Sequence, residues 1–217
     1  MGRHSDKARE VLLNAAEELF ARHGIDAVSN RKITEHAGTA NHSAIKYHFG
    51  AKDDLLRAMV QRAVDDVRVC REKLVGDDSA DPTSLRELVT VHTLALIHSF
   101  DALPRPSWRA QFLFQVRLRP EFTEMLAGLI SEGIQRRAAA SDTLEELKGI
   151  PEVVVSSRAR ILGPMVLGLC AEYEALVNEG EQRGSWESMG YFVVDAVVGM
   201  LAAPSTAPAD FMDFTQK

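Results

Sequence analysis

A short stretch between Gly38 and Gly50 is rich in side chains that could meet the edges of nucleic-acid bases. Asparagine can form two hydrogen bonds with adenine, and a methyl side chain can contact the methyl group of thymine. Lysine, serine, tyrosine and histidine can bind phosphate oxygens. The residues of this stretch that we expect to meet DNA are Asn41, His42, Ser43, Ala44, Lys46, Tyr47 and His48.

Such side chains need a short, rigid helix that apolar residues hold from behind. Ile45 and Phe49 are four residues apart and therefore share one face of a helix. Ahead of them, Ser29 can cap a second short helix that ends at Gly38. An amphipathic pattern from about residue 5 to residue 23 predicts a longer helix in front of both. This order is typical of a helix-turn-helix reader of duplex DNA.

Further contacts with DNA are expected at the edges of this unit. Arg31 can reach a guanine edge or a phosphate, and the amides that follow Ser29, with Asn30, suit a phosphate oxygen. Lys52 opens the next helix and is placed for a contact with the DNA backbone. Arg31 could instead form a structural ion pair with Glu35, four residues further on.

Three of the candidate side chains have a plain structural alternative. Tyr47 and His48 could cover the back of the three-helix core instead of facing DNA. His42 could be a solvated residue of the turn. The whole segment could also be an amphipathic three-helix core without any reading function.

The motifs AA..LF...G, S.RKI...AG and YHF..K..L, at the spacing found between Val11 and Leu56, resemble the N-terminal domain of the TetR family of bacterial transcriptional repressors. The chain departs from the commonest family pattern in two ways. It has one residue more between Gly38 and Tyr47, and Lys46 stands where the family often has tyrosine. A lysine there should make DNA binding more sensitive to salt.

Composition favours a soluble, all-α protein. Hydrophobic residues make up 46% of the 217 residues, aromatic residues 6%, and apolar positions recur every three or four residues. The net charge is -6, yet residues 1–50 hold seven Lys and Arg against six Asp and Glu. The acidity therefore lies outside the predicted DNA reader. Neither a signal peptide nor an uninterrupted apolar run of membrane-spanning length is evident, so we expect a cytoplasmic protein that does not enter a membrane.

The remainder of the chain reads as a helical body, which gives about nine helices in total. We expect a long helix after Gly50, a helix from about Pro82 to Phe100, one from about Trp108 to Arg117, and one from Pro120 to about Ala140. Two strongly apolar helices should then span Glu152 to Glu179 and Trp186 to Ala202. Residues 1–50 would be the DNA-binding domain, 51–203 a regulatory and dimerisation domain, and 204–217 a flexible tail.

The resemblance implies a homodimer and a small-molecule effector. The last two long helices of each copy would form the dimer interface, although both could be buried within one chain. A dimer would bind an inverted-repeat operator. A hydrophobic or amphipathic effector would enter the body and shift the helix after Gly50. The residues expected to line its cavity, which could equally be core residues, are His92, Phe100, Trp108, Phe112, Gln115, Met165, Leu169 and Tyr173.

Other classes of function are less well supported. His92, His98, Glu172 and Glu174 could supply acid and base groups, but no nucleophile motif, metal-ligand spacing or phosphate loop accompanies them. We therefore expect no enzymatic activity, no catalytic residues, no metal and no cofactor. A DNA-organising protein that uses the same reader without an effector remains the alternative. The sign of regulation, repression or activation, depends on where the operator lies.

Overall fold

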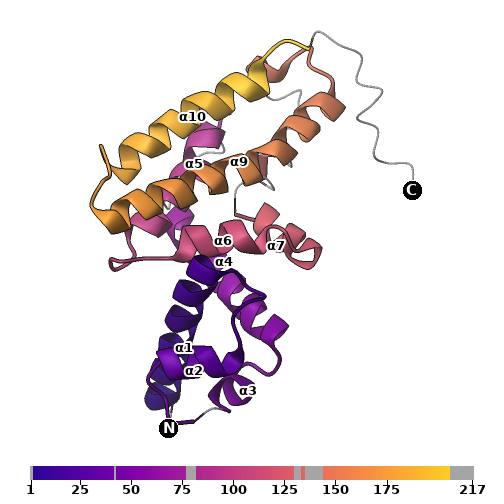
Figure 1. Ribbon diagram of the computed structural model, residues 1–217. Helices are drawn as coiled ribbons and strands as arrows, with labels where there is room; N and C mark the ends of the chain where they lie inside the picture. The colour runs from indigo at the N-terminus through magenta and orange to yellow at the C-terminus, as the bar shows by residue number, and fades with distance from the viewer. Residues whose placement is uncertain (1, 42, 77–81, 130–132, 135–143, 206–217) are drawn as a thin grey trace. The chain divides into compact units, whose positions relative to one another are not determined.

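The computed structural model describes residues 2–41, 43–76, 82–129, 133–134 and 144–205, with side chains from residue 6 onward (Figure 1). Within these residues the chain forms nine α helices and two 3-10 helices, and no strand. The predicted all-α fold is confirmed. His42 and the end of the predicted tail, residues 206–217, lie outside the described residues.

Contacts divide the chain into two compact units. The first consists of Met1–Val64, Leu103–Met125 and Leu167–Gln182, and the second of Asp65–Ala102, Leu126–Val166 and Arg183–Lys217. The predicted boundary after residue 50 divides the chain by function, whereas these two units are defined by contacts. The units therefore do not test that boundary, which stays a prediction.

The first unit contains the segment that resembles a DNA reader. Its complete helices are α1 (Gly2–His23), α2 (Asn30–His36), α3 (Ala44–His48) and α6 (Arg109–Val116). Parts of α4 (Lys52–Val75) and α9 (Glu152–Glu179) complete it. Phe20 of α1 stacks on Phe112 of α6 with ring centroids 6.1 Å apart. Both rings are fully buried, so this pair ties the long first helix to α6 through an apolar contact.

The second unit is built on α5 (Leu85–Asp101) and α10 (Trp186–Ala202), which pack against each other. Gly190 makes this approach possible, because a Cβ atom there would lie 2.8 Å from Leu94 Cδ2. Phe100 of α5 packs on Trp186 with ring centroids 5.7 Å apart. The 3-10 helix η3 (Glu145–Leu147) contacts both helices.

The helices after Gly50 mostly agree with the predicted ranges. α4, α9 and α10 begin and end where the periodic patterns do. The helix expected from Pro120 to Ala140 is a correction: Pro120–Phe122 form the 3-10 helix η1, and α7 covers only Thr123–Ala127. The chain turns at Gly128, a residue type that lowers helix stability by about 1 kcal/mol. Residues 130–132 and 135–143 of the expected helix lie outside the described residues.

Among the described residues one helix, α9, is long and apolar enough by length and composition to cross a membrane. Long core helices of globular proteins pass the same test. Arg158 on α9 donates to the carbonyls of Leu201 and Ala203 at the end of α10, and Glu174 on α9 accepts hydrogen bonds from the start of α6. These polar contacts are those of a helix that packs inside a protein.

Candidate nucleic-acid interface

The start of α2 is held in the way that the sequence predicts. Ser29 is the N-cap, and its hydroxyl accepts a hydrogen bond from the Lys32 amide at 3.2 Å. Ile33 and Thr34 are fully buried, which fixes the inner face of the helix. Asn30 is half-buried, and its Oδ1 has no hydrogen-bond partner among the described residues. α2 thus turns its Arg31 side to solvent.

Arg31 forms the ion pair that was the structural alternative to a DNA contact. Its Nε donates to Glu35 Oε1 at 2.7 Å, and the side chains are 76% and 49% exposed. The Glu35 carboxylate raises the pKa of Arg31, so the guanidinium stays charged. A pair this exposed to solvent contributes little to stability, so a phosphate could compete for Arg31 at little cost.

Two residues of α3 are strongly presented to solvent. Ile45 is completely buried and anchors the helix, whereas Lys46 is exposed and Tyr47 is 79% exposed. The alternative in which Tyr47 covers the core is therefore wrong. Ser43, at the start of α3, is also exposed and makes no side-chain cap. Ser43, Lys46 and Tyr47 form an accessible polar face of the kind that can enter a DNA groove.

The end of α3 packs more tightly. His48 is half-buried and meets Tyr47 edge-on, with ring centroids 4.9 Å apart. Phe49, expected as a second anchor, is only half-buried, and the Arg9 guanidinium lies 5.0 Å above its ring. A cation over an aromatic face is attracted to it. Arg9 of α1 therefore closes the outer side of the three-helix unit.

The helix-turn-helix segment also matches a known family. Residues 12–59 fit the model of the bacterial regulatory proteins of the tetR family. The match covers the DNA-binding segment, which is similar to that of the tetR family. It is 26% identical over 147 residues to the HTH-type transcriptional repressor KstR2 of Rhodococcus jostii (strain RHA1), which covers 64% of this chain and 71% of that relative.

Solved structures of TetR-family proteins share the fold. A TetR family transcription regulator from Marinobacter aquaeolei VT8 has a TM-score of 0.62 at 17% identity, with 92% of this chain and 98% of that chain covered. AmtR of Mycobacterium smegmatis has a TM-score of 0.54 at 23% identity, with 88% and 92% covered. At these identities the two structures show a shared fold, and the match of residues 12–59 shows a segment similar to the tetR-family regulators.

One residue that we expected to touch DNA has other surroundings. Ala44 is only 6% exposed and packs inward beside Ile45, so its methyl group does not face solvent for a thymine contact. The helical period explains this, because Ala44 precedes the anchor and starts the buried face of a five-residue helix. His42 lies outside the described residues.

Lys52 is the clearest correction. Its ammonium donates to the carbonyls of Ile25 at 2.5 Å and Val28 at 2.7 Å, and it lies 5.5 Å from the Phe20 ring centroid. Burial lowers the pKa of Lys52, an effect that the charge of Asp26 opposes. The side chain thus joins the start of α4 to the loop between α1 and α2 and does not point to a phosphate.

Replacing Lys52 with methionine should lower the free energy of unfolding by about 1–3 kcal/mol, because two carbonyls lose their partner while the apolar stem remains. The salt dependence of DNA binding should stay unchanged. Urea denaturation and DNA titrations at several salt concentrations measure both quantities. Lys32→Met is the matched control, since Lys32 is exposed on α2 and its loss should leave stability unaltered. If the Lys52→Met protein has normal stability and a reduced salt slope, Lys52 contacts a DNA phosphate as first predicted.

Sequence reasoning missed two exposed lysines of this helix-turn-helix unit. Lys7 on α1 and Lys32 on α2 are both exposed. Lys7 lies at a groove of about 600 Å³ on the helix-turn-helix unit, and Val11 of the same helix is 42% exposed there. The groove is lined by Lys7, Ala8, Val11, Leu12, Ala37, Gly38, Thr39, Ala40, Asn41, Ala44 and His48. Lys32 directly follows Arg31, and this pair of basic residues was the feature of the sequence that could have identified Lys32.

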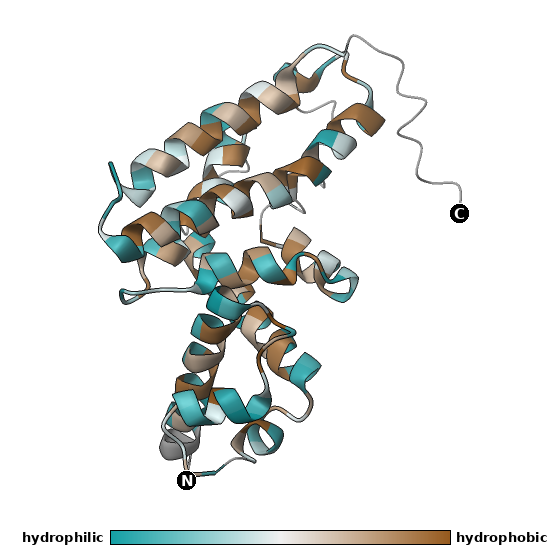
Figure 2. Cartoon of the chain, viewed as in Figure 1, coloured by the Kyte–Doolittle hydropathy of each residue, from teal (hydrophilic) through white to brown (hydrophobic). Residues whose placement is uncertain are grey.

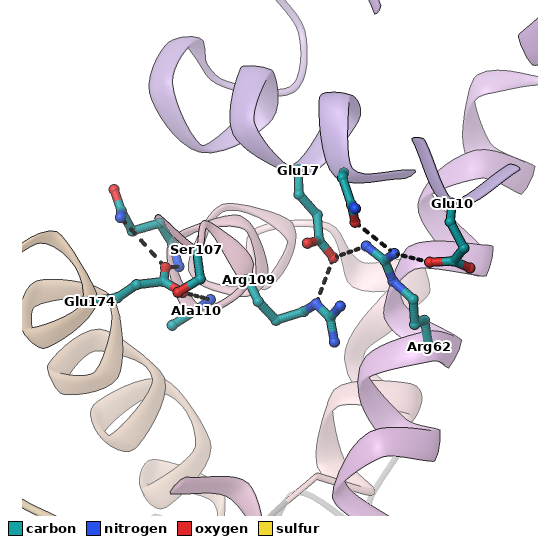
Figure 3. Close-up of polar contacts among 9 residues, drawn as sticks. Glu10, Glu17, Arg62, Ser107, Arg109, Ala110 and Glu174 are labelled. Carbon is teal, nitrogen blue, oxygen red and sulfur yellow. Dashed lines mark hydrogen bonds and ion pairs between the residues drawn. The ribbon is translucent and has the colours of Figure 1, made fainter. Parts of the chain in front are cut away.

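A buried charge network links α1, α4 and α6 within the first unit (Figure 3). Glu17 of α1 is 6% exposed, and its Oε1 receives Arg109 Nε of α6 at 2.6 Å and lies 2.6 Å from an Arg62 nitrogen of α4. Arg62 also donates to Glu10 at 2.7 Å and to Asn14 at 3.0 Å. One buried carboxylate therefore pairs with two guanidinium groups, and Glu10 supplies a second carboxylate to Arg62, which fixes α1 relative to α6 and α4.

Glu174, one of the acid and base candidates, has a structural task. It is completely buried, and it accepts hydrogen bonds from the Ser107 hydroxyl at 3.0 Å and from the amides of Ala110 and Gln111 at 3.2 and 3.0 Å (Figure 3). Burial raises the pKa of Glu174, and the two amides and the hydroxyl oppose that rise. Its oxygens hold the first turn of α6 to α9, as an N-terminal cap does.

The predicted effector residues are spread over the two units. Trp108, Phe112, Gln115, Leu169 and Tyr173 belong to the first unit, and His92, Phe100 and Met165 to the second. Phe100 and Phe112 are buried in ring contacts of their own cores, as the alternative interpretation expected, and Met165 is 42% exposed. Gln115 lines a pocket of about 650 Å³ with His23 and Arg119. The effector cavity stays a prediction.

Proposed function

We propose that this regulator is a repressor that binds an inverted-repeat operator as a homodimer and is released by a hydrophobic or amphipathic small molecule. The observation that carries the DNA-binding part is the outward face of α3: Lys46 exposed and Tyr47 79% exposed above a fully buried Ile45. The direction of control is supported by the relative from Rhodococcus jostii, which is a transcriptional repressor.

The proposed DNA contacts follow from exposure. Ser43, Lys46 and Tyr47 enter the major groove, with His48 at its edge. Arg31 leaves Glu35 to bind a phosphate or a guanine, and Ser29 and Asn30 hold the start of α2 beside the same strand. An operator is identified by selecting bound duplexes from a random pool with the full-length protein. An enriched inverted repeat supports the proposal, and enrichment of no sequence contradicts it.

Replacing Lys46 with alanine should reduce the slope of log affinity against log salt by about one, because one phosphate contact is lost. Titrations of the selected operator at several salt concentrations measure the slope. Lys73→Ala removes the same charge from the second unit and should leave the slope unchanged. Equal slopes for Lys46→Ala and the unmodified protein would mean that Lys46 makes no phosphate contact.

The dimer rests on apolar surface of the second unit. Phe192 on α10 is 66% exposed and Tyr191 50% exposed, while Val193 and Val197 of the same helix are buried. Figure 2 shows the hydrophobic (brown) positions that recur along α10. Gly199 lies about two helical turns after Phe192 and therefore on the same side of α10. A Cβ atom at Gly199 would meet open space. Ile161 on α9 is 56% exposed. Burial of this surface against a second copy would remove apolar area from water.

The effector part is tested by titration of hydrophobic and amphipathic compounds against the operator complex. A compound that moves the protein from 99% to 1% DNA-competent must distinguish the two states by about 5.5 kcal/mol. In this mechanism, binding in the body shifts α4, which is continuous with the helix-turn-helix unit. If compounds bind tightly and DNA affinity never changes, the regulator works without an effector, as a DNA-organising protein would.

A further inference from the structure

Asn41 is an exposed residue at the centre of the turn between α2 and α3. Its Oδ1 accepts a hydrogen bond from the Ser43 amide at 2.9 Å, and its backbone carbonyl accepts one from the Ala44 amide at 3.0 Å. One residue therefore supplies the acceptors for two successive amides at the start of α3. A side chain that bonds to the backbone two residues on defines this type of turn.

Two further hydrogen bonds connect Asn41 to α2 through Thr39. The Asn41 amide donates to Thr39 Oγ1 at 3.3 Å, and the Thr39 amide donates to the Thr34 carbonyl of α2 at 3.1 Å. Thr34 is completely buried. The chain of contacts thus runs from the core of α2 through Thr39 and Asn41 to the first amides of α3.

α3 needs such a brace because it is only five residues long. A helix of this length has too few internal hydrogen bonds to be stable by itself. Its N-cap, Ser43, makes no side-chain cap, and Asn41 supplies acceptors for the amides of Ser43 and Ala44, which precede the amides that such a cap would bind. The direction in which Lys46 and Tyr47 point therefore depends on Asn41.

The same contact bears on how DNA is read. A bidentate pair with adenine needs the Oδ1 acceptor and the Nδ2 donor of asparagine together. Oδ1 already accepts the Ser43 amide, and this contact holds the carboxamide against the backbone of the turn, so pairing with a base would require the side chain to leave it. We propose that Asn41 is a positioning residue that sets the orientation of α3, and that it does not read a base; this inference rests on the proposed role of α3 as the reading helix.

The test compares Asn41→Ala with Asn41→Ser, whose hydroxyl keeps an acceptor for the same turn. The probe is the duplex selected from a random pool by the unmodified full-length protein. Asn41→Ala should weaken binding about tenfold, the size of a typical lost cap. Asn41→Ser should restore binding to within about twofold. The base preferences of both variants should match those of the unmodified protein.

Hydrogen exchange in the absence of DNA supplies a readout that a lost base contact would not move. The Ser43 and Ala44 amides should exchange faster in Asn41→Ala than in Asn41→Ser. Ser43→Ala is the matched control, since the Ser43 side chain makes no cap and its removal should leave these exchange rates unaltered. Loss of preference for adenine at one operator position in both Asn41 variants, or full affinity of Asn41→Ala, would overturn the proposal. If the operator selection itself fails, the exchange experiment still decides whether Asn41 braces α3.

Discussion

Replacing Glu17 with alanine is expected to lower the free energy of unfolding by about 3–5 kcal/mol, the cost of breaking a buried ion pair on one side. Arg109 is 4% exposed and the Arg62 side chain 14% exposed, and both lose the carboxylate that lies 2.6 Å away. Neither guanidinium can shed its charge, because arginine stays protonated in proteins. Urea denaturation of the full-length protein measures the change.

The control for this prediction is Glu35→Ala, which removes a carboxylate from an exposed ion pair of the same unit. It should cost less than about 1 kcal/mol. The double variant Glu17→Met/Arg109→Met should recover part of the loss, since it replaces two paired charges by apolar groups of similar length. A cost for Glu17→Ala no larger than that of Glu35→Ala would show that the network contributes little to stability.

A second large effect is expected for Phe192→Glu. Under the proposed two-fold symmetry, a carboxylate at this exposed position would be buried against the same surface of the other copy. The protein should then be a monomer, and affinity for the full operator should fall by about 100-fold or more, because the second half-site is no longer bound by a linked copy. Analytical ultracentrifugation and titrations of whole and half operators measure the two effects.

Leu118→Glu is the matched control for the dimer. Leu118 is also exposed, at 69%, but it belongs to the first unit. The same charge placed there should leave the oligomeric state unchanged. A Phe192→Glu protein that stays dimeric at the concentration of the unmodified protein would move the interface away from α10.

Local patterns in the sequence were sufficient for most of the helices. The ranges of α4, α9 and α10, the cap at Ser29 and the buried anchor Ile45 all follow from periodicity and capping, which act over three or four residues. The likeness of residues 12–59 to the tetR family also followed from the sequence, because the motifs that carry it lie within one continuous segment.

Tertiary structure decided the roles of individual polar side chains. Lys52 was expected at a phosphate, and it binds the carbonyls of Ile25 and Val28 instead. Glu17 and Arg109 form a buried pair although 92 positions separate them in the chain. Helical period identifies which face of a helix is apolar, but a polar side chain takes whichever partner the packing of distant segments brings within hydrogen-bonding distance. For that reason the sequence by itself determined the helices and the likeness to the tetR family, and only the tertiary structure decided which charges bind one another inside the protein and which remain available to DNA.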